Sequence, residues 1–156
     1  MQKITPFLWF DGKAEEAMNF YLSIFKNGKA LETRRWGEAG PGQKGGVMSV
    51  TFELEGQRFI ALNGGPHYQF SPAVSFFVQC DTQGEVDRYW DKLSEGGEPM
   101  RCGWLKDKYG LTWQIVPKAL GEMLQDKDAA RAARVMNAMM QMIKIDVPTL
   151  EQAYKG

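Results

Sequence analysis

Two segments with helical patterning carry the same arrangement of aromatic, aliphatic and glycine residues, and this repetition constrains the fold more than any other feature. Phe20-Tyr21 recurs as Tyr89-Trp90, Ile24 as Leu93, and Gly28 as Gly97, each time 69 positions later. One offset shared by three features indicates an internal duplication. Chance matches between aromatic pairs in an ordinary α+β chain are the alternative explanation.

The segments around the two helices follow the same order, which is strand, helix, glycine and then further strands. In the first half we expect strands over 4–10, 30–36, 47–54 and 58–62 and a helix over 14–25. In the second half we expect strands over 73–79 and 111–116, a helix over 84–95 and an extended stretch over 100–105. The pattern therefore predicts an α+β fold of two βαβββ units.

Turn and cap residues divide these elements. Asn27-Gly28 predicts a left-handed cap at the end of the first helix, and Asp81-Thr82 predicts the N-terminal cap of the second. Residues 37–46 hold five glycines and one proline, which predicts a mobile loop.

The chain changes character after Pro117. Residues 118–127 and 128–143 have helical patterns, and Asp146-Val147-Pro148 predicts the start of a last short helix. The second of these segments carries a methionine-rich apolar face, made of Val135, Met136, Met139, Met140, Met142 and Ile143. Such a face is expected to pack on the sheet of its own domain or, alternatively, to form a dimer contact.

Composition excludes several classes of protein. Lys and Arg together number 19, as do Asp and Glu, so nothing directs the chain to nucleic acid or to an acidic membrane surface. No apolar run approaches the ~20 residues of a membrane span. Cys80 and Cys102 lack the spacing of a metal finger, and Met1–Ile4 runs directly into a predicted strand rather than a signal peptide. We therefore expect two reduced thiols in a cytoplasmic protein.

Three segments resemble one known family. Residues 9–21 read WFDGKAEEAMNFY, residues 102–117 read CGWLKDKYGLTWQIVP, and residues 142–146 read MIKID. They resemble PhnB-like proteins of the vicinal oxygen chelate superfamily, which also contains glyoxalase I and bleomycin-resistance proteins. The second segment is the long and specific one, and together the three cover most of the chain.

The resemblance implies two βαβββ modules that form a curled mixed sheet around a cleft, followed by a helical C-terminal tail. The implied divisions are 1–66, 67–117 and 118–156, all within one compact domain, and a homodimer is expected. Proteins of this group often carry the label 3-demethylubiquinone-9 3-methyltransferase. The chain shows no strand, glycine-rich loop and helix of the kind that usually binds S-adenosylmethionine, so methyl transfer is not the reading we favour.

Metal-dependent relatives place a His or Glu ligand on the first and last strand of each module, because imidazole and carboxylate groups bind divalent cations. The matching positions here fall at Thr5, at Ile60 or Ala61, at Ser75 and at Gln114. None of these residue types holds a divalent ion tightly. His67, the only histidine, lies in a loop away from these positions and is read as an exposed polar residue. We predict no bound metal, no cofactor and no glyoxalase I activity.

The same positions still suit a small organic ligand. Strand alternation predicts one aromatic face with neutral hydrogen-bonding groups, and the expected cleft residues are Thr5, Phe7, Trp9, Asn63, Ser75, Phe77, Cys102 and Gln114. A purely structural role in the core is the alternative for the aromatic members. Cys102, with lysines nearby, could be a nucleophile, but a structural or cleft-lining role is the reading we prefer.

The sequence therefore predicts a metal-free protein that binds a small molecule in an aromatic-lined cleft. Two alternatives remain, which are an enzyme of unknown reaction in the same superfamily and a dimerisation module that uses the methionine-rich tail.

Overall fold

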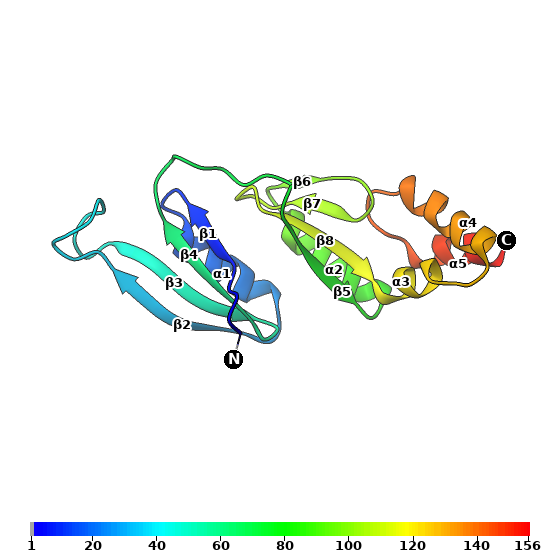
Figure 1. The fold of residues 1–156 in the computed structure, drawn as a ribbon, viewed down its shortest axis with the longest axis horizontal. Coiled ribbons are helices and arrows are strands. Elements are labelled where there is room, and N and C mark those ends of the chain that lie inside the picture. Colours follow the sequence, from blue (N-terminus) through cyan, green and yellow to red (C-terminus); the bar gives the residue numbers. More distant parts are fainter. Residues whose placement is uncertain (1) are drawn as a thin grey trace. The chain divides into compact units, whose positions relative to one another are not determined.

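The computed structural model describes residues 2–156 and forms two compact units, the first ending at Gln69 and the second beginning at Phe70. Each unit holds one four-stranded mixed sheet and a helix packed on it, and the second unit also carries three C-terminal helices (Figure 1). The predicted α+β fold with two βαβββ units is confirmed.

The first unit contains one helix and four strands. They are β1 (Phe7–Phe10), α1 (Ala14–Ile24), β2 (Gly28–Arg35), β3 (Val47–Leu54) and β4 (Gln57–Asn63). The spatial order of the strands is β1-β4-β3-β2, with β1 parallel to β4 and the other neighbours antiparallel. The helix α1 returns the chain so that β2 runs parallel to β1, and two antiparallel pairings then bring β4 beside β1 in the same direction.

Aromatic rings fill the space between α1 and this sheet. One side of α1 is buried, at Ala14, Ala17, Met18, Tyr21 and Ile24. The ring of Tyr21 lies 6.3 Å from that of Phe52, which stacks at 5.5 Å on Phe59. Burying one such side chain contributes about 1.5–3 kcal/mol. These contacts leave the opposite face of the sheet without a helix of this unit.

Two local predictions for the first unit are wrong. The first strand begins at Phe7 rather than residue 4, so Thr5 precedes the strand; the carbonyl of Pro6 accepts the hydrogen bond from the Ile60 amide that starts the ladder. Gly28 is not a left-handed cap. A Cβ there would lie 2.9 Å from Leu22 Cδ2 and 3.2 Å from the Glu53 carbonyl oxygen, so glycine is needed for close approach.

The second unit repeats the plan of the first. Its elements are β5 (Ser75–Cys80), α2 (Gln83–Ser94), β6 (Glu98–Pro99), β7 (Trp104–Lys106) and β8 (Thr112–Pro117), with the spatial order β5-β8-β7-β6. Thr82 caps α2 as predicted, since its hydroxyl accepts a hydrogen bond from the Glu85 amide at 3.1 Å. One side of α2 is buried, at Val86, Tyr89, Trp90 and Leu93.

The paired glycines of the repeat have matching roles. A Cβ on Gly97 would lie 2.1 Å from the Lys106 carbonyl oxygen, as one on Gly28 would meet the Glu53 carbonyl. In each unit the glycine lies where the chain leaves the helix and passes over a carbonyl of the next strand. The offset seen in the sequence therefore marks equivalent positions in the fold.

A buried carboxylate holds the turn before β8. Asp107 is 2% exposed; one oxygen accepts the Tyr109 and Leu111 amides, and the other accepts the Trp113 indole N–H, all within 3.0 Å. The Asp-Lys-Tyr-Gly part of the family-like segment thus shapes the turn that sets the register of β8.

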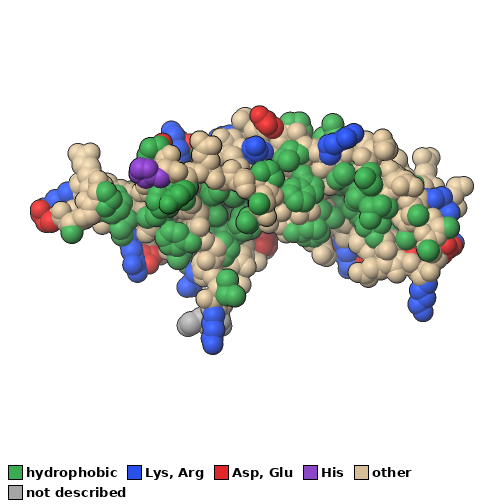
Figure 2. Space-filling view, turned by 45° about the horizontal axis from the view of Figure 1, so that its top comes forward, with side chains coloured by type: hydrophobic (Ala, Val, Ile, Leu, Met, Phe, Trp, Pro, Cys, Tyr) green, Lys and Arg blue, Asp and Glu red, His purple; other side chains and the backbone are tan. Residues whose placement is uncertain are grey.

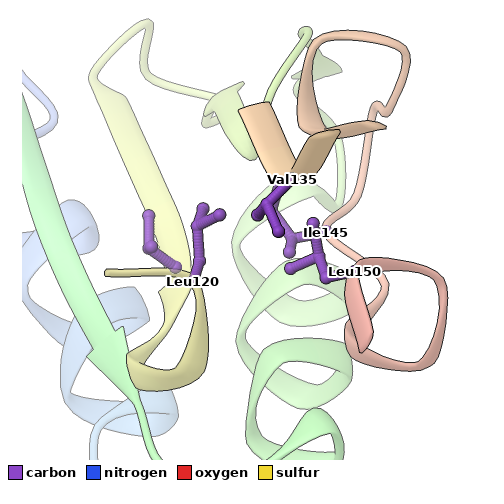
Figure 3. Close-up of a cluster of buried hydrophobic side chains, with 5 residues drawn as sticks. Leu120, Val135, Ile145 and Leu150 are labelled. Atoms are coloured by element: carbon purple, nitrogen blue, oxygen red, sulfur yellow. The ribbon is translucent and has the colours of Figure 1, made fainter. Parts of the chain in front are cut away.

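The C-terminal helices are α3 (Lys118–Leu124), α4 (Ala129–Met140) and α5 (Val147–Lys155). They enclose a small core with the end of β8, formed by Val116, Leu120, Val135, Ile145 and Leu150 (Figure 3). In the described part of the chain, no helix is both long and apolar enough to cross a membrane.

The predicted helix over 128–143 ends early, at Met140. The carbonyls of Met142 and Ile143 instead accept hydrogen bonds from the Cys102 and Gly103 amides, at 2.9 and 2.8 Å. The methionine-rich face also divides in two. Val135, Met139 and Met142 join the core of the tail, whereas Met136, Met140 and Ile143 are 40–53% exposed, so the whole face does not pack on the sheet.

Candidate ligand-binding site

Six side chains form two rows across the second sheet, on the face opposite α2. The strand registers place Phe77, Gln114 and Trp104 in one row, and Ser75, Thr112 and Lys106 in the next. Residues two apart on a strand share a face, so both rows lie on the same side. We call these six residues the Gln114 face.

A side-chain hydrogen bond joins the two rows. Gln114 Nε2 donates to Ser75 Oγ at 3.0 Å, linking β8 to β5. Both residues were predicted to line the cleft, and in the structure their side chains are hydrogen-bonded to each other. This bond uses one amide hydrogen of Gln114, so its carbonyl oxygen and the Ser75 hydroxyl hydrogen keep the capacity to bond a ligand.

Thr112 supplies a buried polar atom beside this pair. The residue is fully buried, and its Oγ1 has no hydrogen-bond partner among residues 2–156. Leaving a buried hydroxyl unpaired costs about 1–3 kcal/mol.

Two aromatic side chains flank Gln114 in its row. Phe77 is 59% exposed, although strands usually turn such residues inward, and Trp104 is half-buried. Hydrophobic side chains reach the surface of this unit beside polar ones, as Figure 2 shows. A flat apolar group could lie against these rings while its polar atoms meet Gln114 and Ser75.

The first unit places its predicted aromatic residues on the matching face of its own sheet. Phe7 is 58% exposed. Trp9 is half-buried, donates through Nε1 to the Gly65 carbonyl at 2.9 Å and meets the ring of Tyr68 edge-on at 4.8 Å. A Cβ on Gly64 would lie 2.4 Å from the indole, so the loop after β4 closes over Trp9.

Asn63 has both polar atoms committed to backbone groups. Its Oδ1 accepts the Ala14 amide at 2.9 Å and its Nδ2 donates to the Val47 carbonyl at 3.0 Å. The residue before α1, Lys13, provides no side-chain cap. Asn63 therefore supplies the helix cap from the end of β4.

The two cysteines have different surroundings. Cys80 is fully buried, and burial, followed by the charges of Glu85 and Asp81, raises the pKa of its thiol to about 12. Cys102 is half-buried and adopts φ +60°, directly before Gly103. The Cys102 backbone bonds the tail, which gives this residue a structural function in the segment 102–117.

The donors near these positions do not match a divalent metal. Within the part of the chain that the structure describes, no three His, Cys, Asp or Glu residues are grouped closely enough to hold an ion. His67 is exposed in its loop. The Gln114 face instead carries the ammonium of Lys106, which opposes a bound cation by charge.

Sequence reasoning missed Trp104 and Lys106 as members of this face. Both lie in β7; Trp104 falls within the stretch 100–105 that the sequence indicated only as extended, and Lys106 falls just after it. Their place beside Gln114 and Thr112 depends on the β7–β8 register, and no local pattern specifies it.

Comparisons with known proteins agree with this architecture. The family model described as 3-demethylubiquinone-9 3-methyltransferase matches residues 2–116. A PhnB protein structure from Bacillus cereus is 41% identical, covers 74% of this chain and 99% of its own, and has a TM-score of 0.68. No curated protein matches the chain.

More distant structures share the fold. Protein PA1353 from Pseudomonas aeruginosa is 19% identical, with 75% of this chain and 98% of its own covered and a TM-score of 0.63. The fosfomycin resistance protein FosX from Mesorhizobium loti is 13% identical, with 81% and 100% covered and a TM-score of 0.56. The chain therefore belongs to the 3-demethylubiquinone-9 3-methyltransferase family, as a PhnB-like protein of the vicinal oxygen chelate superfamily.

Proposed function

We propose that this protein binds a small organic molecule on the Gln114 face. The observation that carries the proposal is the part-buried Gln114–Ser75 hydrogen bond, because Gln114 lies between the exposed ring of Phe77 and the half-buried ring of Trp104. A few polar groups among aromatic side chains are typical of a ligand-binding surface.

The chemistry of the two rows limits the ligand. The row of Phe77, Gln114 and Trp104 suits a flat apolar body, and the row of Ser75, Thr112 and Lys106 suits a hydrogen-bonding or anionic group.

The mixed, four-stranded sheets differ from the doubly wound parallel sheet that holds nucleotide-like cofactors at a glycine-rich loop. Ligand binding therefore describes the site better than the methyl transfer in the family's name. Two unpaired cysteines suit a reducing, cytoplasmic location.

A ligand screen with matched variants tests the proposal. Flat aromatic acids, amides and phenols are screened by thermal shift, and hits are measured by calorimetry against Gln114→Leu. Loss of the amide is expected to weaken binding about tenfold, which is ~1.4 kcal/mol. Gln79→Leu is the control, because Gln79 is exposed on the same strand as Ser75 and Phe77 but outside the two rows.

Two results would refute the proposal. One is that no compound in such a screen stabilises the protein. The other is that a bound compound loses equal affinity in Gln79→Leu and Gln114→Leu, which would place it elsewhere on the molecule.

A further inference from the structure

Lys106 places a positive charge on the Gln114 face. The residue is half-buried in β7, and its side chain forms no ion pair with any of residues 2–156. The neighbouring carboxylate, Asp107, is buried and already bonds the Trp113 indole and two backbone amides. A cation that is partly removed from water is stabilised when an anion binds to it.

The repeat in the chain provides an internal comparison for this lysine. Lys29 and Glu98 occupy equivalent edge-strand positions, 69 residues apart. Lys29 lies opposite Glu53 and forms an ion pair with it at 3.8 Å. Glu98 lies opposite Lys106 with the two charges exchanged, but the pair forms no such contact in the part of the chain that the structure describes. The ammonium of Lys106 is therefore available to another anion.

A second hydrogen-bond donor lies in the same row as Lys106. Ser75 Oγ accepts the hydrogen bond from Gln114 Nε2 at 3.0 Å, so the hydroxyl hydrogen of Ser75 is left to donate. Ser75 and Lys106 are the two neighbours of Thr112 across the strands, which places their Cα atoms about 10 Å apart. Thr112 itself is fully buried. A polar group of a ligand in this row would therefore meet the serine hydroxyl and the lysine ammonium.

The neighbouring row supplies a surface for the body of such a ligand. Phe77 and Trp104 lie on either side of Gln114, and the two rows are about 7 Å apart along the strands. A fused ring system that carries an acid group directly on the ring can span this distance. Its rings would lie against the aromatic side chains while the acid group lies in the row of Ser75 and Lys106.

A carboxylate matches the donors of that row better than a neutral group does. It carries a negative charge for Lys106 and has two acceptor oxygens, one of which can accept from the Ser75 hydroxyl. We propose that the ligand of the Gln114 face is a planar aromatic carboxylate, whose acid group is bound by Lys106 and Ser75. This inference rests on the proposed binding function of the face and adds the chemical class of the ligand.

Paired acids and amides test the charge of the ligand. Naphthalene-2-carboxylate and indole-3-carboxylate are titrated into the unaltered chain by calorimetry, each beside its neutral carboxamide of nearly the same shape. The acids are expected to bind about tenfold more tightly than the amides, because a hydrogen bond to a charged group is stronger than a neutral one. Lys106→Met should remove this preference and leave the affinity for the amides within about twofold of its original value.

Two further variants sharpen the test. Lys92→Met is the control, because Lys92 is exposed on α2, on the other side of the sheet, and the change in net charge is the same. Glu98→Gln removes a negative charge opposite Lys106, so it is expected to strengthen acid binding by about twofold and to leave the amides unchanged.

The results that would overturn the proposal differ in what they say of the face itself. If acids and amides bind equally, and Gln114→Leu weakens both whereas Lys106→Met weakens neither, the face binds a neutral ligand and only the acidic class is wrong. An acid preference that falls equally in Lys92→Met and Lys106→Met would assign it to net charge rather than to this site. If neither series binds at millimolar concentration, the proposed binding function fails together with the ligand class.

Discussion

Individual side chains determine what the second sheet can bind. Gln114 occupies the position where metal-dependent relatives of this superfamily are expected to carry a carboxylate, and it forms a neutral bond to Ser75 instead. Lys106 lies one row away and adds positive charge. An amide, two hydroxyls and an ammonium favour an acceptor-rich or anionic ligand and disfavour a cation.

The buried thiol of Cys80 has a shifted pKa that a stability measurement can detect. Its thiol has a pKa of about 12 in the folded protein against an ordinary value of 9.0, because burial disfavours the thiolate. The folded state therefore holds this proton more tightly than the unfolded state. The stability gained is complete below about pH 9 and is lost as the pH rises toward 12.

The Cys80 effect predicts a specific pH dependence. Between pH 9 and 11 the free energy of unfolding should fall more steeply in the unaltered chain than in Cys80→Ala, by up to about 1.4 kcal/mol per pH unit. Urea unfolding at several pH values measures both slopes, and the comparison removes the contribution of lysines and tyrosines. Parallel slopes would show that the thiol titrates normally.

At the scale of helices and strands, local sequence patterns correctly predicted the features that depend on residues close together in the chain. The two helices α1 and α2, the Thr82 cap and the order of elements are all confirmed, because each depends on patterns within about four turns of chain. The errors arose where distant residues act. The early end of α4, at Met140, follows from hydrogen bonds with Cys102 and Gly103, some forty positions earlier in the chain.

The candidate site also depends partly on residues that the sequence identifies and partly on contacts between distant strands. Ser75 and Gln114 were found from the resemblance, but Trp104 and Lys106 join them only through the β7–β8 register. Asn63 was expected in the cleft, and its two hydrogen bonds cap α1 and tie β4 to β3. A polar residue in a family-like position can therefore serve the fold, and contacts across strands are needed to tell the two functions apart.

The attachment of the tail gives a prediction at this scale. Gln83→Ala removes the two hydrogen bonds that the Gln83 side chain forms with the tail and leaves the Val147 amide without its partner, at a cost of about 1–3 kcal/mol. Amides of α5 should then exchange about tenfold or more faster by hydrogen–deuterium exchange, while those of α1 keep their rates. Gln125→Ala, an exposed glutamine at the end of α3, is the matched control. Unchanged exchange in α5 would mean that the other contacts of the tail hold it in place without Gln83.

At the scale of the whole molecule, the chain consists of two units with similar sheets, and the second unit also carries the three helices of the tail. Each sheet has a helix on one face and exposed aromatic residues on the other, Phe7 in the first unit and Phe77 in the second. The family fold is therefore present in full, whereas the residue types at its expected ligand positions are Thr5, Ile60 or Ala61, Ser75 and Gln114. We propose that this chain keeps the fold and carries neutral and cationic groups in place of metal ligands.

Metal content tests that claim most directly. Untagged protein, purified without chelator, is dialysed against zinc, nickel and manganese at neutral pH and analysed by mass spectrometry of the elements, with Gln114→Glu measured in parallel. We expect well below one equivalent of any divalent ion per chain in the unaltered protein. One equivalent that resists dialysis, and whose affinity falls when Ser75 or Gln114 is replaced by alanine, would contradict it.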